Sequence, residues 1–282
     1  MSENKKFVKI KSFAKVNLSL NVIGRMKNKN HKIESLITFI NYYDEIKIRN
    51  SNKNHHIIKF NGKFAKGISK NNTIKKLLDI LDKKNYLNNK KFEVKIKKNI
   101  PHSSGLGGGS MNAATLMQFL FKKKSKKNFE EVASKIGSDV RLGREKKNMI
   151  LFKNGEIFKT SKKILLHVLV CKPNFGCSTK LIYSGIKKFT RSEYNLKTQN
   201  YFGIDKLADY KNDLENVAFN KYSKLSNLKF FFDNLPNLLF SRMTGSGSAI
   251  VGYFKYQKDA KNANKLIKKQ YKSYWSIISK TI

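Results

Sequence analysis

The sequence is poor in three features that mark common classes of protein. It has only two cysteines, Cys171 and Cys177, too few for a disulfide framework, so we expect a reduced, cytoplasmic environment. Its clearest apolar run, residues 164–171, falls far short of the roughly 20 residues that a membrane helix needs. The N-terminal residues carry charge without a following apolar stretch, so we expect no signal peptide. A folded cytoplasmic protein is therefore expected.

Acidic residues are also scarce. Nineteen Asp and Glu stand against 59 Lys and Arg, which gives a formal net charge of +40. One interpretation is a nucleic-acid-binding protein. However, the lysines are spread along the whole chain and accompany many asparagines and isoleucines, a pattern typical of an AT-rich genome. We therefore favour a small-molecule enzyme without a nucleic-acid partner, whose basic surface helps to attract an anionic substrate.

Several well-known catalytic and cofactor motifs are missing. No Gly-Lys-Ser/Thr follows the glycines as a Walker loop requires, and Gly105, Gly107 and Gly109 lack the spacing of the dinucleotide fingerprint. The five histidines show no metal-ligand spacing, and no nucleophile elbow occurs. We therefore predict neither a protein-held metal site nor a Ser-His-Asp hydrolase.

The most informative stretch that is present is residues 101–114, Pro-His-Ser-Ser-Gly-Leu-Gly-Gly-Gly-Ser-Met-Asn-Ala-Ala. A β-rich run, residues 92–96, precedes it, and apolar residues at helical spacing follow it. Glycines let a ligand approach the backbone, and a helix N-terminus offers free N–H groups and a positive dipole end. The pattern predicts a phosphate-binding loop. The alternative is a mobile hinge before an ordinary helix.

Strands and helices are interspersed without strict alternation, so we predict an α+β fold. We place a domain boundary near residue 160, which gives domains 1–160 and 161–282. Residues 122–127 are predicted to be a solvated basic link. The clearest predicted helices are 72–82, 128–136, 206–220, 225–235 and 258–270, and the clearest predicted strands are 44–48, 92–96, 148–152, 165–170, 250–254 and 275–278.

A phosphotransferase also needs an acidic group for the acceptor hydroxyl, a cation and a metal, usually Mg²⁺. Asp139 is the candidate acid because it follows a glycine in a chain with few carboxylates. The alternative is an ordinary turn residue. Lys15 is the candidate cation because it is the only positive charge within residues 12–18. It could equally be one more surface lysine.

Five segments, taken in order, resemble the GHMP kinase superfamily and, within it, the 4-diphosphocytidyl-2-C-methyl-D-erythritol kinases. The segments are residues 13–20, 101–114, 137–140, 212–215 and 244–247. The resemblance implies a two-domain fold, with a ribosomal S5 domain 2-like N-terminal ATP-binding domain and a ferredoxin-like C-terminal domain. It implies transfer of the γ-phosphate of ATP to the 2-hydroxyl of a cytidine-diphosphate-linked methylerythritol, in the non-mevalonate isoprenoid pathway. Another GHMP small-molecule kinase remains the alternative.

The resemblance also assigns roles on the ATP side of the reaction. Asp139 matches the catalytic acid that accepts the hydroxyl proton. Lys15 matches the cation that keeps this acid ionised and stabilises the transferring phosphoryl group. ATP is the co-substrate, with Mg²⁺, to whose shell the hydroxyl of Ser110 could contribute. The implied ATP-binding residues are Pro101, Ser103, Gly105, Leu106, Gly107, Gly108, Gly109 and Ser110.

On the acceptor side, Asn17 would contact the substrate and His31 would read the cytosine. Tyr183 would stack on the cytosine ring. Gly245 and Ser246 lie in a turn that would close over the site. The family pattern is broken in three places: Asn30 stands where a tyrosine is frequent, Met111 replaces a frequent serine, and Arg141 and Leu142 follow the Asp139 segment. A monomer or a homodimer is expected.

Overall fold

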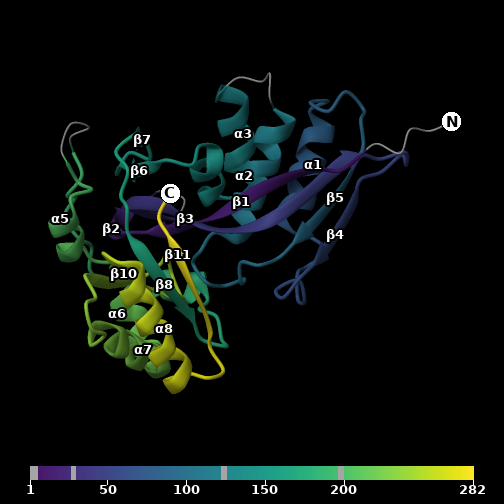
Figure 1. Ribbon diagram of the computed structural model, residues 1–282. Coiled ribbons are helices and arrows are strands. Elements are labelled where there is room, and N and C mark those ends of the chain that lie inside the picture. Colours follow the sequence, from purple (N-terminus) through teal and green to yellow (C-terminus); the bar gives the residue numbers. More distant parts are fainter. Residues whose placement is uncertain (1–5, 27–29, 122–125, 196–199) are drawn as a thin grey trace. The chain divides into compact units, whose positions relative to one another are not determined.

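The computed structural model describes residues 6–26, 30–121, 126–195 and 200–282 (Figure 1). These residues form two compact units, each discontinuous in sequence. The first unit draws on Met1–Ala14, Tyr42–His102 and Gly107–Lys146, and the second on Lys15–Asn41, Ser103–Leu106 and Lys147–Ile282. The division into domains at residue 160 stays a prediction.

Helices and strands follow one another irregularly along the chain, as expected for an α+β protein. The described elements are β1 (Val8–Asn17), β2 (Asn21–Arg25), β3 (His31–Asn50), β4 (Ile57–Asn61), α1 (Thr73–Lys83), β5 (Phe92–Lys97), α2 (Gly108–Leu120), α3 (Lys126–Ile136), the 3₁₀ helix η1 (Ser138–Arg144), β6 (Asn148–Leu151), β7 (Ile157–Thr160), β8 (His167–Lys172), α4 (Thr179–Ser184), α5 (Ile204–Asp209), α6 (Leu214–Lys221), α7 (Ser223–Asp233), β9 (Phe240–Met243), β10 (Ile250–Phe254), α8 (Gln257–Gln270) and β11 (Trp275–Lys280).

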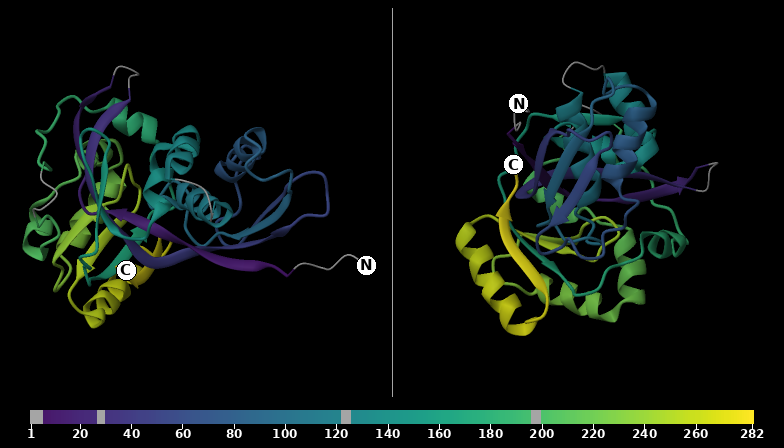
Figure 2. Two further views of the ribbon diagram at one scale, coloured as in Figure 1. Left: turned by 90° about the horizontal axis from the view of Figure 1, so that it is seen from above. Right: turned by 90° about the vertical axis from the view of Figure 1, so that its right-hand side faces the viewer.

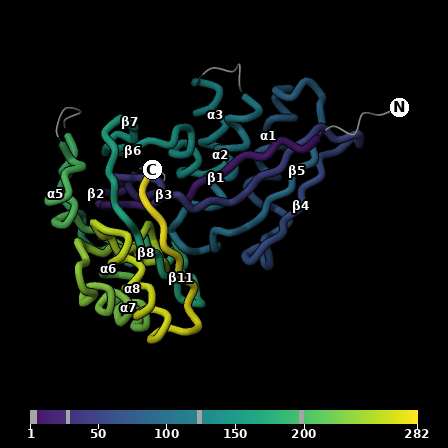
Figure 3. Tube along the Cα trace, in the orientation of Figure 1, coloured from purple at the N-terminus to yellow at the C-terminus, as the bar shows by residue number. Residues whose placement is uncertain are grey.

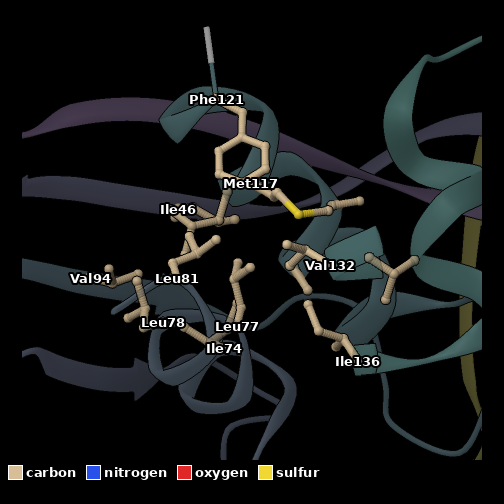
Figure 4. Close-up of a cluster of buried hydrophobic side chains, with 14 of the residues drawn as sticks. Ile46, Ile74, Leu77, Leu78, Leu81, Val94, Met117, Phe121, Val132 and Ile136 are labelled. Carbon is tan, nitrogen blue, oxygen red and sulfur yellow. The ribbon is translucent and has the colours of Figure 1, made fainter. Parts of the chain in front are cut away.

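In the first unit, helices α1, α2 and α3 pack on strands β3, β4 and β5. Strand β5 pairs antiparallel with the second half of β3 and parallel with β4. Helix α1 begins after Asn72, whose side chain accepts hydrogen bonds from the N–H groups of Ile74 and Lys75. Its apolar positions recur every three or four residues and form one buried face. Figure 4 shows this core, with side chains from α1, α2 and α3 meeting those of β3 and β5.

In the second unit, a four-stranded antiparallel sheet has the order β11-β8-β10-β9. Numbered along the chain, that order is 4-1-3-2, with helices between the first two strands and between the last two, which is the ferredoxin-like βαββαβ arrangement. Helices α6, α7 and α8 bury apolar residues against Leu169, Cys171 and Ile250 of this sheet. The chain can be followed through these elements in Figures 2 and 3. The ferredoxin-like expectation is confirmed.

A second group of strands in this unit carries several candidate site residues. Strand β2 pairs antiparallel with the start of β3, where Asn21 lies opposite Glu34. The next part of β3 pairs with β6, where Ser35 lies opposite Leu151, and β6 pairs with β7. These pairings fix the positions of residues 31–37, among them His31.

Three predictions about elements were wrong in detail. The predicted helix 206–220 is two helices, α5 and α6, because Asn212 turns the chain between them. Its side chain accepts from the N–H of Leu214 and donates to the carbonyls of Met243 and Gly245. Lys126 and Lys127 belong to α3 and not to a link, while residues 122–125 lie outside the described residues. The strand predicted at 44–48 is the end of a 20-residue strand, β3.

Over the described ranges, every helix is too short or too polar to serve as a membrane span.

Candidate active site

The start of helix α2 has the features of an anion-binding site. Gly107, the N-cap residue, has φ +71°, a left-handed conformation that suits glycine, and its side-chain-free position provides no capping bond. The first helical bond runs from the N–H of Met111 to the carbonyl of Gly107, at 2.8 Å. The N–H groups of residues 108–110 precede that bond, so they are the ones a helix leaves for a ligand. This end of α2 therefore suits a phosphate.

Asp139 lies on η1, which packs closely on α2 within the first unit. A Cβ on Gly143 of η1 would lie 2.5 Å from Cβ of Ala114 and 3.1 Å from Sδ of Met111, so only glycine permits this approach. Met111 is buried and fills space between the two helices. The methionine that replaces the family's serine thus supports the element that carries Asp139, which is half-buried in its first turn.

A buried ion pair anchors the chain before the glycines. Asp44 is fully buried, and its carboxylate pairs with Lys98, which is 5% exposed. The same carboxylate accepts from the backbone N–H of Asn99 at 2.7 Å, the N–H of Ile100 at 2.8 Å and Nδ2 of Asn112 at 2.9 Å. It therefore joins the end of β5 to the second turn of α2. Sequence reasoning missed this pair, although a carboxylate in an apolar strand of a chain with 19 acids was a usable signal.

In the second unit, residues 103–106 pack against the turn at residues 244–248. Gly105 has φ +77°, and a Cβ there would lie 1.8 Å from the carbonyl oxygen of Thr244. The carbonyls of Ser103 and Ser104 accept from the N–H groups of Ser248 and Ala249, at 3.3 and 3.2 Å. The two glycine clusters that the sequence places 140 residues apart, Gly105 and Gly245, are therefore neighbours.

Lys15 and Asn17 lie beside these two clusters. The N–H of Lys15 donates to the carbonyl of Leu106 at 3.1 Å, and its Nζ donates to Oδ1 of Asn17 at 2.7 Å. The N–H of Asn17 donates to Oγ1 of Thr244 at 3.1 Å. Lys15 is 3% exposed and Asn17 is 4% exposed. Lys15 is therefore a buried, oriented cation and not one more surface lysine.

His31 and Tyr183 form the second group of candidate residues in this unit. Their ring centroids lie 5.0 Å apart with an interplanar angle of 38°. Nε2 of His31 is buried and has no hydrogen-bond partner among the described residues. Burial, and then the nearby charge of Arg25, lower the pKa of His31, so its ring is neutral near pH 7. A neutral ring nitrogen next to an aromatic face suits a planar polar ligand.

The turn at residues 244–248 is also tied to the helix that carries Tyr183. Oγ of Ser246 lies 2.8 Å from Oγ1 of Thr179, the first residue of α4. His31 and Ser35 are four residues apart on β3, so their side chains lie on the same side of the strand, about 13 Å apart. The second unit therefore presents the Lys15 group and the His31 group along one strand.

The candidate residues divide between the two units. The first unit contains Pro101, Gly107, Gly108, Gly109, Ser110 and Asp139, and the second contains Lys15, Asn17, His31, Ser103, Gly105, Leu106, Tyr183, Gly245 and Ser246. Each unit brings its own set together as described. Among the described residues, no cluster of three or more His, Cys, Asp or Glu could hold a metal ion.

Comparison with known proteins relates this chain to kinases. Residues 72–146 match the family model of the GHMP kinases N terminal domain. The chain is 51% identical to 4-diphosphocytidyl-2-C-methyl-D-erythritol kinase of Pelagibacter ubique, over 97% of this chain and 99% of that protein. It is 33% identical to the kinase of the same name from Petrotoga mobilis, over 86% of this chain and 96% of that protein.

Solved structures show the same fold. A crystal structure of 4-(cytidine 5'-diphospho)-2C-methyl-D-erythritol kinase matches with a TM-score of 0.78 and 22% identity, over 97% of this chain and 99% of that one. Homoserine kinase from Cytophaga hutchinsonii matches with a TM-score of 0.65 and 16% identity, over 100% of this chain and 96% of that one. The structural match reaches the whole superfamily, whereas the full-length sequence identity is specific. The chain therefore belongs to the 4-diphosphocytidyl-2-C-methyl-D-erythritol kinase family of GHMP kinases.

Proposed function

We propose that this chain is an ATP-dependent kinase that phosphorylates the 2-hydroxyl of 4-diphosphocytidyl-2-C-methyl-D-erythritol in isoprenoid biosynthesis. The observation that carries the proposal is the 51% identity, over 97% of the chain, to a relative of that name. A cytoplasmic location is part of the proposal. Both cysteines, Cys171 and Cys177, are buried free thiols, which agrees with a reducing compartment.

The His31 and Tyr183 pair supports a cytidine-containing substrate. Tyr183 offers a ring face for stacking, and the unpartnered Nε2 of His31 offers one hydrogen bond. A pyrimidine base has both a π face and polar edge atoms, so it can use both groups at once. Strand β3 then leads from His31 towards Lys15 and Asn17, in the direction that a diphosphate and its attached sugar alcohol would extend.

The start of α2 supports binding of the ATP phosphates. Its glycines expose N–H groups near the positive end of the helix dipole, and Ser110 adds a hydroxyl in the first turn. A Mg²⁺ ion fits this arrangement as an ion held mainly by the phosphates and water, since Ser110 is an oxygen donor and the described residues provide no carboxylate cage. When bound, Mg²⁺ neutralises charge on the phosphate oxygens.

The reaction assigns separate roles to Asp139 and Lys15. Asp139 accepts the proton of the attacking 2-hydroxyl. The ammonium of Lys15 stabilises the negative charge on the transferring phosphoryl group. The glycine N–H groups hold the β- and γ-phosphates in place, and the buried setting of Lys15 strengthens its electrostatic effect. Positioning and charge stabilisation supply most of the catalysis, as is general for phosphoryl transfer.

The direct test is incubation of the purified chain with ATP, Mg²⁺ and 4-diphosphocytidyl-2-C-methyl-D-erythritol. Mass spectrometry should detect ADP and the 2-phosphate in equal amounts. A parallel panel with homoserine and mevalonate as acceptors tests the alternative of another GHMP kinase. Turnover of one of these acceptors, without turnover of the cytidine compound, would overturn the proposal.

The role of Asp139 is tested with Asp139→Asn. This variant keeps the shape of the side chain but cannot accept the proton, so kcat should fall at least about 10²-fold. The matched control is Asp79→Asn, which changes an exposed acid on α1 in the same unit and should leave kcat unchanged. Full activity in Asp139→Asn would remove Asp139 from the mechanism.

A further inference from the structure

Ser35 is a fully buried hydroxyl that the mechanism above does not use. It lies on β3, and its Oγ accepts a hydrogen bond from Nδ2 of Asn17 at 2.9 Å. Its other contacts are with carbonyl oxygens, that of Ser19 and, at 3.4 Å, that of Leu36. A carbonyl can only accept, so the single hydroxyl proton of Ser35 is donated to a carbonyl.

This arrangement determines which way the amide of Asn17 faces. Because the proton of Ser35 is committed to a carbonyl, its oxygen can only accept from Asn17, and Nδ2 must point to Ser35. Oδ1 must then point to Nζ of Lys15, which lies 2.7 Å away. With the amide turned over, an NH₂ group would face the ammonium, and two donors would meet. The hydroxyl of Ser35 therefore selects the amide orientation that binds Lys15.

The surrounding contacts hold Ser35 itself in place. The carbonyl that accepts from Ser35 belongs to Ser19, whose own Oγ accepts from the N–H of Leu36 at 2.9 Å and from the hydroxyl of Tyr194 at 2.7 Å. Ser19 is fully buried and Tyr194 is 1% exposed. The anchor of the network is thus a closed set of hydrogen bonds in a region that solvent does not reach.

We propose that Ser35 is a positioning residue for phosphoryl transfer, which orients the Lys15 ammonium through the amide of Asn17. The inference rests on the proposed kinase function. It gives Asn17 a role beyond the predicted contact with substrate. A neutral amide directs the ammonium without cancelling its charge, so Lys15 is aimed and remains fully cationic.

The test is steady-state kinetics on Ser35→Ala with the cytidine substrate, ATP and Mg²⁺. We expect kcat to fall about tenfold, because misplacement of a catalytic group by a fraction of its reach is costly. KM for both substrates should stay within about twofold, because Ser35 contacts neither. Ser35→Thr keeps the hydroxyl in a residue that strands favour, and should restore most of kcat.

Two further variants separate positioning from a loss of structure. Thr38→Val removes another fully buried hydroxyl from β3, one that bonds to Asn148, so it should lower stability without lowering kcat. In an Asn17→Ala background, Ser35→Ala should cause no further loss of kcat, because it acts only through Asn17. If Ser35→Ala fails to fold, Ser35→Cys, which keeps the volume but is a weak acceptor, replaces it throughout.

The outcomes are distinct. An unchanged kcat in Ser35→Ala, independent losses from the two substitutions, or an equal loss in Thr38→Val would each overturn the inference while leaving the kinase function standing. Absence of turnover by the unmodified chain would instead overturn the proposed function itself.

Discussion

Each unit of this protein contains a buried lysine and a partly buried histidine, but their partners differ. In the first unit, Lys98 pairs with the carboxylate of Asp44, and His56 lies between Asp82 and the N–H of Phe92. In the second unit, Nζ of Lys15 donates to a neutral amide. His31 there lies against the ring of Tyr183.

The difference separates structural groups from functional ones. A lysine bound to a buried carboxylate has its charge balanced by the fold, so it holds elements together. A lysine oriented by an amide keeps a charge that a phosphoryl group can use. In the same way, His56 spends both ring nitrogens on the protein, whereas Nε2 of His31 has no partner in the described part of the chain. Four predictions test this comparison, in order of decreasing effect.

The largest effect is expected from breaking the ion pair of the first unit. Lys98→Met leaves the carboxylate of Asp44 buried without its cation, which should cost about 3–5 kcal/mol of unfolding free energy. Urea denaturation followed by circular dichroism measures this loss. Adding Asp44→Asn removes the second charge and should recover part of the stability. A loss below about 1 kcal/mol in Lys98→Met would show that this pair is not structural.

The next effect concerns catalysis. Lys15→Met should lower kcat about 10²–10³-fold, as loss of a preorganised electrostatic group does. Its cost in stability should be smaller than that of Lys98→Met, because no buried carboxylate partner is known to be stranded in its unit. ADP release reports kcat, and urea denaturation reports stability. Lys261→Met, on the surface of α8, is the control for both. If stability falls more than kcat does, the two lysines do not differ as described.

A third effect compares the two aromatic pairs. Tyr183→Leu removes a stacking face, which should cost about 1–3 kcal/mol of binding, or roughly a 5–150-fold rise in KM for the cytidine substrate. KM for ATP should not change. The control is Phe92→Leu, which removes the ring that stacks on His56 in the first unit at 6.1 Å, and should lower stability alone. An equal rise in KM for both substrates would argue against a base-stacking role for Tyr183.

The smallest effect is a pH dependence of stability. Burial is the main cause that lowers the pKa values of His56 and His31, so the unfolded chain binds protons more readily than the folded one. Their contribution to stability is complete above the ordinary histidine pKa of about 6.5 and is lost as the pH falls through the lowered values. Denaturation midpoints between pH 8 and 5 should show this decline. His56→Gln should make the decline shallower, and an unchanged slope would contradict it.

The elements with strong local signals were predictable from the sequence. The predicted helix 72–82 is observed as Thr73–Lys83, because a capping asparagine and a clean apolar periodicity both specify it. The glycine-rich segment and its following helix were also predictable, since their turn chemistry is local. The break between α5 and α6 was not, because Asn212 is stabilised there by carbonyls about 30 residues away.

The candidate site was predictable only in part. Lys15, His31 and Tyr183 follow from motif resemblance, and the structure then shows their burial and partners. Asp44, Lys98 and Ser35 were not found, since nothing local distinguishes them. Their importance comes from contacts between strands or between a strand and a helix. Single-sequence reasoning identifies groups that resemble known chemistry more readily than the groups that hold them.

Lys15 and Asn17 are separated by two residues on β1, so both side chains project from the same side of the strand. The lysine and the amide that aims it are thus inherited as a unit. Insertion or deletion of one residue just before them would turn both away together, whereas one between them would separate them. Engineering of this strand should therefore preserve the Lys-Val-Asn triplet as a block, and changes in length are better placed in the loops beyond its ends.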